Sequence, residues 1–135
     1  MKSEKNLVEV QLVQTEDKIP IVQKSWGFER IVCNNELYCG KELVCIYGKW
    51  SSEGKFHYHK KKDEVFYVVS GALELETIQF KTGFNKVFEY FLKRGDSFRI
   101  KPFVAHRFRS KSKMFCKFIE FSTTHFDEDT FYLEE

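Results

Sequence analysis

Short runs of residues that favour extended structure follow one another along this chain, and turn residues separate them. The first run alternates apolar and polar residues, and the runs together cover 6–13, 26–33, 41–50, 64–71, 72–80, 86–93 and 114–122. Turn signals between them include Asn34-Asn35, Ser51-Ser52, Gly71, Thr82-Gly83 and Gly95-Asp96. No stretch shows a convincing 3.6-residue apolar stripe. Many short strands at this spacing predict an antiparallel β-sandwich or barrel with little helix.

Composition favours the same architecture. The chain has 15 Phe and 6 Tyr but only two Ala. Aromatic residues suit a pleated sheet, whereas Ala is the best helix former. A length of 135 residues fits one domain with a sizeable core. The net charge of +2 gives no argument for a nucleic-acid partner.

The cysteines and the N-terminal segment indicate the cellular compartment of the protein. Cys33, Cys39, Cys45 and Cys116 form no CxxC pair, which disfavours a zinc ribbon and favours small buried side chains. The N-terminal stretch has no apolar signal region, and no run approaches the length of a membrane span. We therefore expect a cytoplasmic protein with reduced thiols and no membrane partner.

The segment "GKFHYHKKKDE" (54–64) predicts a metal site. Residues i and i+2 of a strand face the same way, so His57 and His59 can bind one ion. Glu64 follows a short turn and can reach the same point, and His106 is a candidate fourth ligand from a distant strand. Such a set leaves coordination positions open, as reactive metals require. Taken alone, the histidine pair is also compatible with a strand surface and the lysines with a solvated turn.

Two longer segments resemble the motifs of the cupin superfamily. "HYHKKKDEVFYVVSG" resembles the first motif and "GDSFRIKPFVAH" the second, which places the motifs at 54–71 and 95–106. The resemblance implies a single-domain jelly roll (a double-stranded β-helix barrel) over 1–135, with an acidic C-terminal tail at 127–135. It also implies one divalent transition metal (Mn, Zn, Fe or Ni) bound by four ligands: His57, His59, Glu64 and His106. Ser51 and Phe103 stand where the motifs often have Gly.

The flanking segments show a less specific resemblance. "WGFERIV…YCGKEL" and "IEFSTTHFDED" are similar to small cupins grouped with mannose-6-phosphate isomerase and sugar-nucleotide enzymes. This resemblance implies a carbohydrate substrate.

Strand alternation predicts the direction of further side chains. Phe66 and Val68 should point inward with Glu64, whereas Arg107 and Arg109 should point away from the side that His106 faces. If His57 and His59 point inward, so do Lys55 and Glu53, and Lys55 can then hold a phosphate or act as a base. Tyr47 is a third candidate to carry a proton, and a strand-end lysine in water is the alternative for Lys55. We expect Lys60, Lys61 and Lys62 to form a solvated turn, and the alternative is that they meet an anionic substrate at the mouth of the barrel. His125 and the tail can close the mouth of the barrel.

These residues support three hypotheses about function. The first is an isomerase or epimerase that acts on a sugar phosphate or nucleotide sugar through a metal-stabilised enediolate. The second is an Fe(II)-dependent dioxygenase, and the third is a non-catalytic sugar-binding module. The expected partner is a phosphorylated or nucleotide-linked sugar, not a nucleic acid. Outward aromatic residues such as Tyr67 and Phe88 predict a homodimer.

Overall fold

Strands dominate the computed structural model, which describes residues 11–79 and 86–133. The strands are β1 (Ile21–Lys24), β2 (Gly27–Asn34), β3 (Cys39–Cys45), β4 (His57–Tyr58), β5 (Glu64–Ser70), β6 (Ala72–Gln79), β7 (Val87–Lys93), β8 (Ser97–Ile100), β9 (Val104–Ser110), β10 (Cys116–Ser122) and β11 (Phe131–Tyr132). The helical elements of the described part are three short 3₁₀ turns: η2 (Glu16–Lys18), η3 (Ser51–Gly54) and η4 (Asp127–Asp129). None of the described helices is long and apolar enough to cross a membrane.

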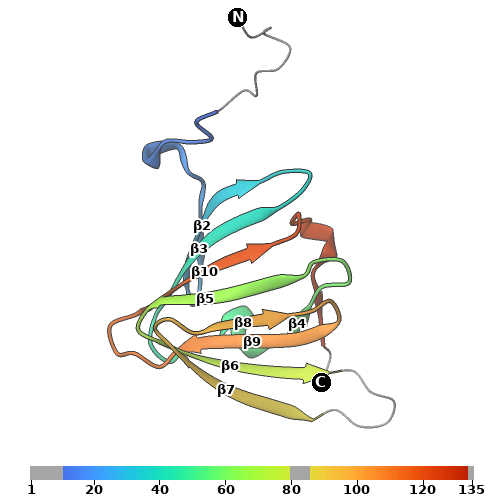
Figure 1. Cartoon of the computed structure of the whole chain (residues 1–135). Helices are drawn as coiled ribbons and strands as arrows, with labels where there is room; N and C mark the ends of the chain where they lie inside the picture. Colours follow the sequence, from blue (N-terminus) through green and yellow to red (C-terminus); the bar gives the residue numbers. More distant parts are fainter. Residues whose placement is uncertain (1–10, 80–85, 134–135) are drawn as a thin grey trace, which may run out of the picture.

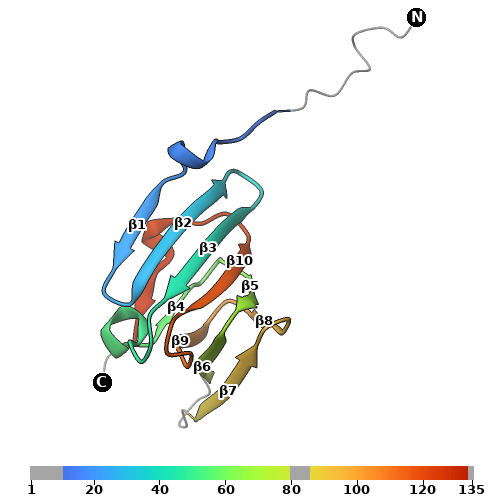
Figure 2. The same ribbon diagram turned by 90° about the vertical axis from the view of Figure 1, so that its left-hand side faces the viewer.

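The strands form two antiparallel sheets that enclose a jelly-roll barrel (Figures 1 and 2). One sheet has the order β1-β2-β3-β10-β5-β8, and the other has the order β11-β4-β9-β6-β7. The chain passes from one sheet to the other several times, so strands distant in sequence become neighbours. The prediction of an all-β jelly roll with little helix is confirmed.

Most of the strands expected from the sequence are present, with two corrections. The run expected at 41–50 is a strand only as far as Cys45. The predicted strand at 6–13 is wrong where it can be checked, because 11–13 has no regular structure and Leu12 and Val13 are exposed. These apolar side chains have no sheet to pack against. Residues 6–10 and the Thr82-Gly83 turn lie outside the described residues.

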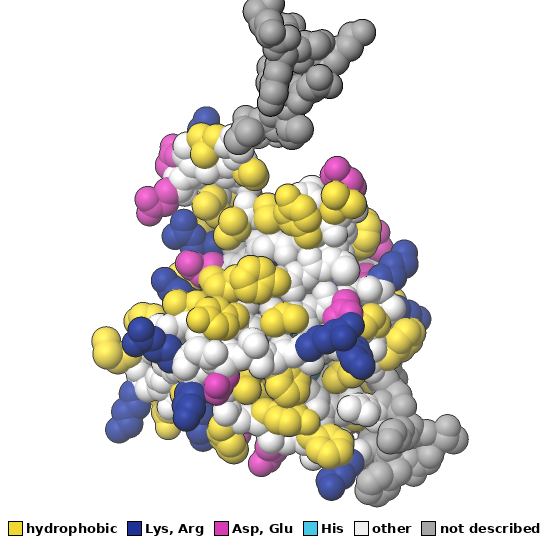
Figure 3. Space-filling model, viewed as in Figure 1, with side chains coloured by type: hydrophobic (Ala, Val, Ile, Leu, Met, Phe, Trp, Pro, Cys, Tyr) yellow, Lys and Arg dark blue, Asp and Glu magenta, His cyan; other side chains and the backbone are white. Residues whose placement is uncertain are grey.

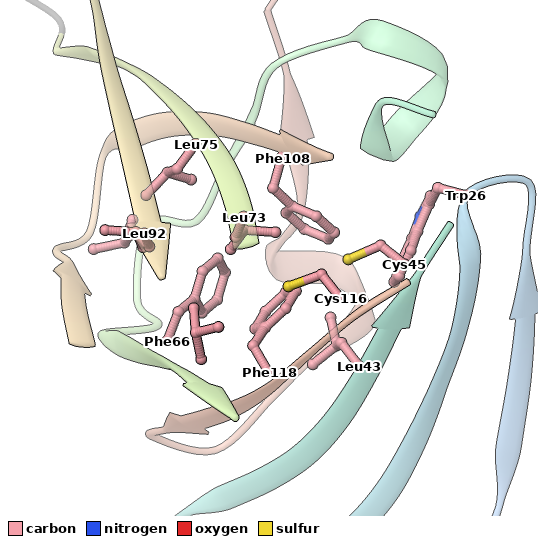
Figure 4. Close-up of a cluster of buried hydrophobic side chains, with 12 residues drawn as sticks. Trp26, Leu43, Cys45, Phe66, Leu73, Leu75, Leu92, Phe108, Cys116 and Phe118 are labelled. Atoms are coloured by element: carbon pink, nitrogen blue, oxygen red, sulfur yellow. The ribbon is translucent and has the colours of Figure 1, made fainter. Parts of the chain in front are cut away.

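An aromatic cluster forms the centre of the core (Figure 4). The ring centroids of Phe66 and Phe118 are 4.7 Å apart, and those of Phe108 and Phe118 are 5.1 Å apart. Trp26 packs its edge on Phe108 at 5.0 Å, so it is a core residue. Phe66 and Val68 point inward from β5, as the alternation from Glu64 predicts. Cys45 and Cys116 lie opposite each other on β3 and β10, both as free thiols.

Gly71 makes the tight connection between β5 and β6. Its φ of +80° is unfavourable for other residues. A Cβ atom at this position would also lie 2.6 Å from the Phe115 carbonyl oxygen. The glycine therefore allows β5 to continue into β6 beside the loop that precedes β10.

The outer face of β6 and β9 is covered by ion pairs. Arg107 binds Glu76, with a nitrogen–oxygen distance of 2.6 Å, and Arg109 binds Glu74. Both guanidinium groups also stack on the Trp50 ring, at 4.1 and 4.2 Å from its centroid. Arg107 and Arg109 thus point away from the barrel interior, as expected from the sequence.

Candidate metal centre and pocket

Three histidines converge inside one end of the barrel. His57 on β4 and His106 on β9 are paired across the two strands, and their ring centroids lie 4.2 Å apart. His59 follows β4 directly. Potential ligand atoms of the three imidazoles all lie within 4.8 Å of one another. This geometry allows the three side chains to bind one ion.

Glu64 brings a carboxylate to the same point from the other sheet. It is the first residue of β5 and is 2% exposed. Its Oε2 atom lies 3.4 Å from His59 Nε2, and its Oε1 atom lies 3.8 Å from His106 Nε2. The structure therefore brings together all four ligands that the cupin motifs imply.

Neighbouring backbone carbonyls orient two of the imidazoles. His59 Nδ1 lies 2.8 Å from the Asp129 carbonyl oxygen, and His106 Nδ1 lies 3.0 Å from the Val104 carbonyl oxygen. Because a carbonyl only accepts hydrogen bonds, both Nδ1 atoms donate, and each Nε2 atom keeps a lone pair for an ion.

Unpaired buried atoms and neutral imidazoles fit a bound cation. His57 Nδ1, His106 Nε2 and Glu64 Oε2 are buried without a hydrogen-bond partner in the described part of the chain. Burial lowers the pKa of His59 to about 4 and that of His106 to about 3, and it lowers the pKa of His57 well below its usual value. Neutral imidazoles are the form that binds metals. Three imidazoles and one carboxylate therefore fit a divalent transition metal.

His57, His59 and Glu64 line a pocket of about 460 Å³, and His106 beside them is fully buried. Trp26, Phe66 and Phe108 contribute to an apolar wall, and the lining also includes charged side chains. A volume of this size is typical of sites for small molecules. The centre is thus accessible to a ligand and is not enclosed like a structural metal site.

Lys62 lies in this pocket, which corrects the prediction that Lys60–Lys62 form a solvated turn. Lys60 and Lys61 are exposed, but Lys62 is 3% exposed. Its Nζ atom lies 3.0 Å from Glu120 Oε2 and 3.2 Å from His125 Nδ1. The backbone N–H groups of all three lysines donate to the Asp129 carboxylate. This contact fixes the turn with the third side chain pointing inward.

Two further charged residues of the pocket were not predicted. Glu120 on β10 is 5% exposed. Burial alone would raise its pKa, but Lys62 and Lys41 lower it to about 2, so the group is a carboxylate. Lys41 on β3 is the cross-strand neighbour of Glu120. Strand alternation signals that both point inward, but only the fold shows that they face the histidines.

Lys55, Glu53 and Tyr47 do not reach the metal pocket, contrary to the expectation from alternation. Lys55 and Glu53 are exposed and line a second hollow beside Arg107. The reason is local: β4 begins only at His57, and the preceding turn η3 holds Glu53 at a φ of +55°. Tyr47 follows β3 and is 53% exposed.

Ser51 and Phe103 show how the chain accommodates its departures from the motifs. Phe103 has a φ of +69°, the region that favours the usual glycine, and its N–H donates to the His59 carbonyl at 2.7 Å. Ser51 is buried, and its hydroxyl accepts a hydrogen bond from the Phe108 N–H at 3.0 Å. Both residues therefore support segments that carry pocket residues.

The C-terminal segment packs along the mouth of the pocket, beside β4 (Figure 1). β11 pairs with β4, with Tyr132 opposite His57. His125, Asp127, Thr130 and Tyr132 line the pocket, as expected for a segment that closes the mouth. Glu134 and Glu135, the end of the predicted acidic tail, lie outside the described residues.

Comparisons with solved structures show the same fold. The capsular polysaccharide assembling protein CapF from Staphylococcus aureus superposes with a TM-score of 0.73 at 18% identity, over 87% of this chain and 32% of that chain. Oxalate decarboxylase from Lactobacillus farciminis, in its formate complex, gives 0.74 at 15% identity, over 93% of this chain and 37% of that chain. KdgF from Halomonas sp. gives 0.64 at 20% identity, over 84% of this chain and 95% of that chain.

This chain therefore spans only about a third of CapF and of the decarboxylase. A comparison with curated protein sequences finds no significant match. The family model for the cupin domain matches residues 44–122, more than half of the chain and the segment that contains all four candidate ligands. By sequence and by fold, the chain belongs to the cupin family.

Proposed function

We propose that residues 1–135 form one cupin domain that binds a divalent transition metal and isomerises or epimerises a small phosphorylated or nucleotide-linked sugar. One observation carries this proposal: three of the four candidate ligands line a pocket that also contains buried charged groups from other segments. A metal that only stabilised the fold would need neither the pocket nor these charges.

The four side chains would hold the metal, and other residues would position the substrate. His57, His59, His106 and Glu64 offer nitrogen and oxygen donors suited to Mn, Zn, Fe or Ni. When bound, the ion supplies a positive charge that polarises a substrate oxygen and makes a neighbouring C–H group more acidic. The apolar wall formed by Trp26 and Phe108 would exclude water from one side of the substrate.

His125 is our candidate for the group that carries the proton. It is the one histidine of the chain that is not a candidate ligand, and its ring centroid lies 6.5 Å from that of His59. Its Nε2 atom lies 3.0 Å from Asp127 Oδ1, which holds the ring in place. Burial lowers its pKa below the usual value, so the ring is neutral at neutral pH. Its Nδ1 atom accepts from Lys62 Nζ at 3.2 Å and would take the proton once that ammonium group turns to the substrate.

The sugar part of the proposal rests on two resemblances. CapF, a structural neighbour, is described as a protein that assembles capsular polysaccharide. The resemblance of the flanking segments to the mannose-6-phosphate isomerase group remains a prediction.

Exchange of carbon-bound hydrogen with solvent tests the function. The metal-loaded protein would be incubated in D₂O with a panel of sugar phosphates and nucleotide sugars, and NMR would follow the loss of C–H signals. An isomerase or epimerase that works through proton transfer should incorporate deuterium at a carbon next to a carbonyl. His125→Gln should slow this exchange about 10²- to 10⁴-fold and leave metal content unchanged.

Other outcomes would replace the proposal. Oxygen uptake with an iron-loaded sample, without C–H exchange, would indicate the dioxygenase. Saturable sugar binding with neither exchange nor oxygen uptake would indicate a binding module.

We further propose a homodimer that works in the cytoplasm. Exposed apolar side chains gather on the face shown in Figure 3, and the outer sheet faces carry Tyr67, Phe88 and Phe121, which are 41%, 38% and 55% exposed. A second copy would cover such a surface. Sedimentation should give twice the chain mass of 16.2 kDa, and a monomer at micromolar concentration would contradict the dimer.

The free thiols suit a reducing compartment such as the cytoplasm.

A further inference from the structure

Two buried lysines share the wall of the pocket. Lys41 on β3 is 4% exposed, and Lys62 in the turn before β5 is 3% exposed. Both line the pocket that contains the candidate metal ligands. Glu120 lies between them, as the cross-strand neighbour of Lys41 and the ion-pair partner of Lys62. Lysine is rarely buried to this extent unless its charge is paired.

The ammonium groups have more hydrogen-bond donors than the surrounding residues satisfy. An ammonium group has three N–H donors. Lys62 uses two of them, on Glu120 and His125. The closest carboxylate to Lys41 within the described residues is Glu29, at 3.7 Å, which is beyond hydrogen-bond distance. Up to four donors therefore remain for oxygen atoms in the pocket.

The charge balance favours a negative ligand. The pocket is lined by three cationic and four anionic side chains: Lys24, Lys41 and Lys62, and Glu29, Glu64, Glu120 and Asp127. Burial raises the pKa of Glu64 well above its usual value, so this group ionises when it binds a metal. With Glu64 ionised and the histidines neutral, the side chains sum to −1, and a divalent ion makes the total +1. Buried ion pairs contribute little to stability on average, so a role in the fold alone does not explain two lysines on a pocket wall.

We infer that Lys41 and Lys62 form an anion subsite beside the metal centre, which binds the terminal phosphate or carboxylate of a substrate whose other oxygens face the candidate metal ligands. The inference rests on the proposed function and deepens it, because it assigns recognition of the acidic group to these lysines and not to the exposed Lys55. A terminal acidic group fits best, because both lysines are buried and line the pocket.

Calorimetric titration of the metal-loaded protein tests this subsite. The probes are inorganic phosphate, glucose 6-phosphate, gluconate and glucose, each at one ionic strength, with metal content measured for every sample. Lys41→Met should weaken binding of the preferred anion about 10- to 100-fold and leave glucose binding unchanged. Comparing the phosphates with gluconate shows whether the subsite prefers phosphate or carboxylate.

Matched variants separate the subsite from general charge effects. Lys55→Met makes the same change in charge at an exposed position outside the pocket and should bind all four probes like the wild type. Lys41→Arg keeps the charge and should retain most of the anion affinity. Because Lys62→Met alone would leave Glu120 buried and unpaired, Lys62 is tested in the double variant Lys62→Met with Glu120→Leu, which should also lose anion affinity.

The outcome of these titrations does not depend on whether the protein converts any sugar to product. Equal anion affinity in the wild type and Lys41→Met would overturn the subsite, even if the protein proved to be an isomerase. An equal loss in Lys55→Met would overturn it as well. A selective loss in Lys41→Met, without C–H exchange on any sugar, would support the subsite and contradict only the proposed reaction.

Discussion

The two ends of the barrel interior are built from the same strands but differ in chemistry. At one end, the inward positions of β3, β5, β9 and β10 are charged or bear imidazole: Lys41, Glu64, His106 and Glu120. Further along the same strands, the inward positions are apolar: Leu43, Phe66, Phe108 and Phe118. Two residues along a strand thus separate the candidate site from the hydrophobic core.

Because of this difference, the apolar end mainly stabilises the fold, and the polar end carries the candidate binding site. The apolar end removes aromatic side chains from water, which stabilises the folded chain. The polar end has buried atoms without partners among residues 11–79 and 86–133, a condition that costs free energy unless a ligand or ion satisfies them. We therefore expect substitutions at the two ends to affect different measurements.

The largest expected effect is the loss of metal from the polar end. His57→Ala combined with His59→Ala leaves one imidazole and one carboxylate, so metal content should fall from about one ion per chain to near zero. Elemental analysis after gel filtration measures this. Unchanged metal content in the double variant would mean that the ion binds elsewhere.

At the apolar end, Phe118→Ala should reduce the free energy of unfolding by about 3–5 kcal/mol through loss of a fully buried ring. Urea unfolding measures the change, and Phe91→Ala, at a position that is 63% exposed, serves as the control. Metal content of the folded Phe118→Ala variant should stay near that of the wild type. A loss of metal as complete as in the histidine variant would show that the two ends are not separable.

The polar end should also make the metal-free protein sensitive to acid. The pKa of His59 falls from 6.5 to about 4 in the folded state, mainly through burial. Between pH 6.5 and pH 4, His59 is therefore mostly protonated in the unfolded chain and mostly neutral in the folded chain. Stability should decline by about 3 kcal/mol from this group as the pH falls toward 4.

Urea unfolding of chelator-treated protein, across this pH range, measures the decline. His59→Gln removes one of three histidines with lowered pKa values, so the decline should become smaller by about 3 kcal/mol, and the remainder comes from His57 and His106. The same decline in that variant would assign the effect to other residues.

Substitution of Asp129, which connects the C-terminal segment to the polar end, should have a smaller effect on stability and metal affinity. Asp129→Ala removes the carboxylate that binds the backbone of Lys60, Lys61 and Lys62 but keeps the carbonyl that orients His59. Stability should fall by about 2 kcal/mol, and metal affinity about tenfold. Glu128→Ala changes an exposed neighbour and should alter neither quantity. Equal effects of the two substitutions would contradict the role of Asp129.

The sequence by itself determined the fold class and the four candidate ligands. Alternation within short strands and turn residues between them are local properties, and His57, His59, Glu64 and His106 stand in motifs with characteristic spacing. Alternation also predicted correctly that Phe66 and Val68 point inward, because both lie within the regular strand β5.

Only the tertiary structure decided which other side chains share the pocket. Lys55 and Glu53 were misplaced because alternation fails outside a strand, and the chain at Glu53 is in a turn. Lys62 turns inward because Asp129, distant in sequence, binds the backbone around it. Glu120, Lys41 and His125 come from segments far from the motifs, so their meeting depends on how the two sheets pair. Sequence spacing sets which way a side chain points within a strand, whereas the packing of distant segments sets what it faces.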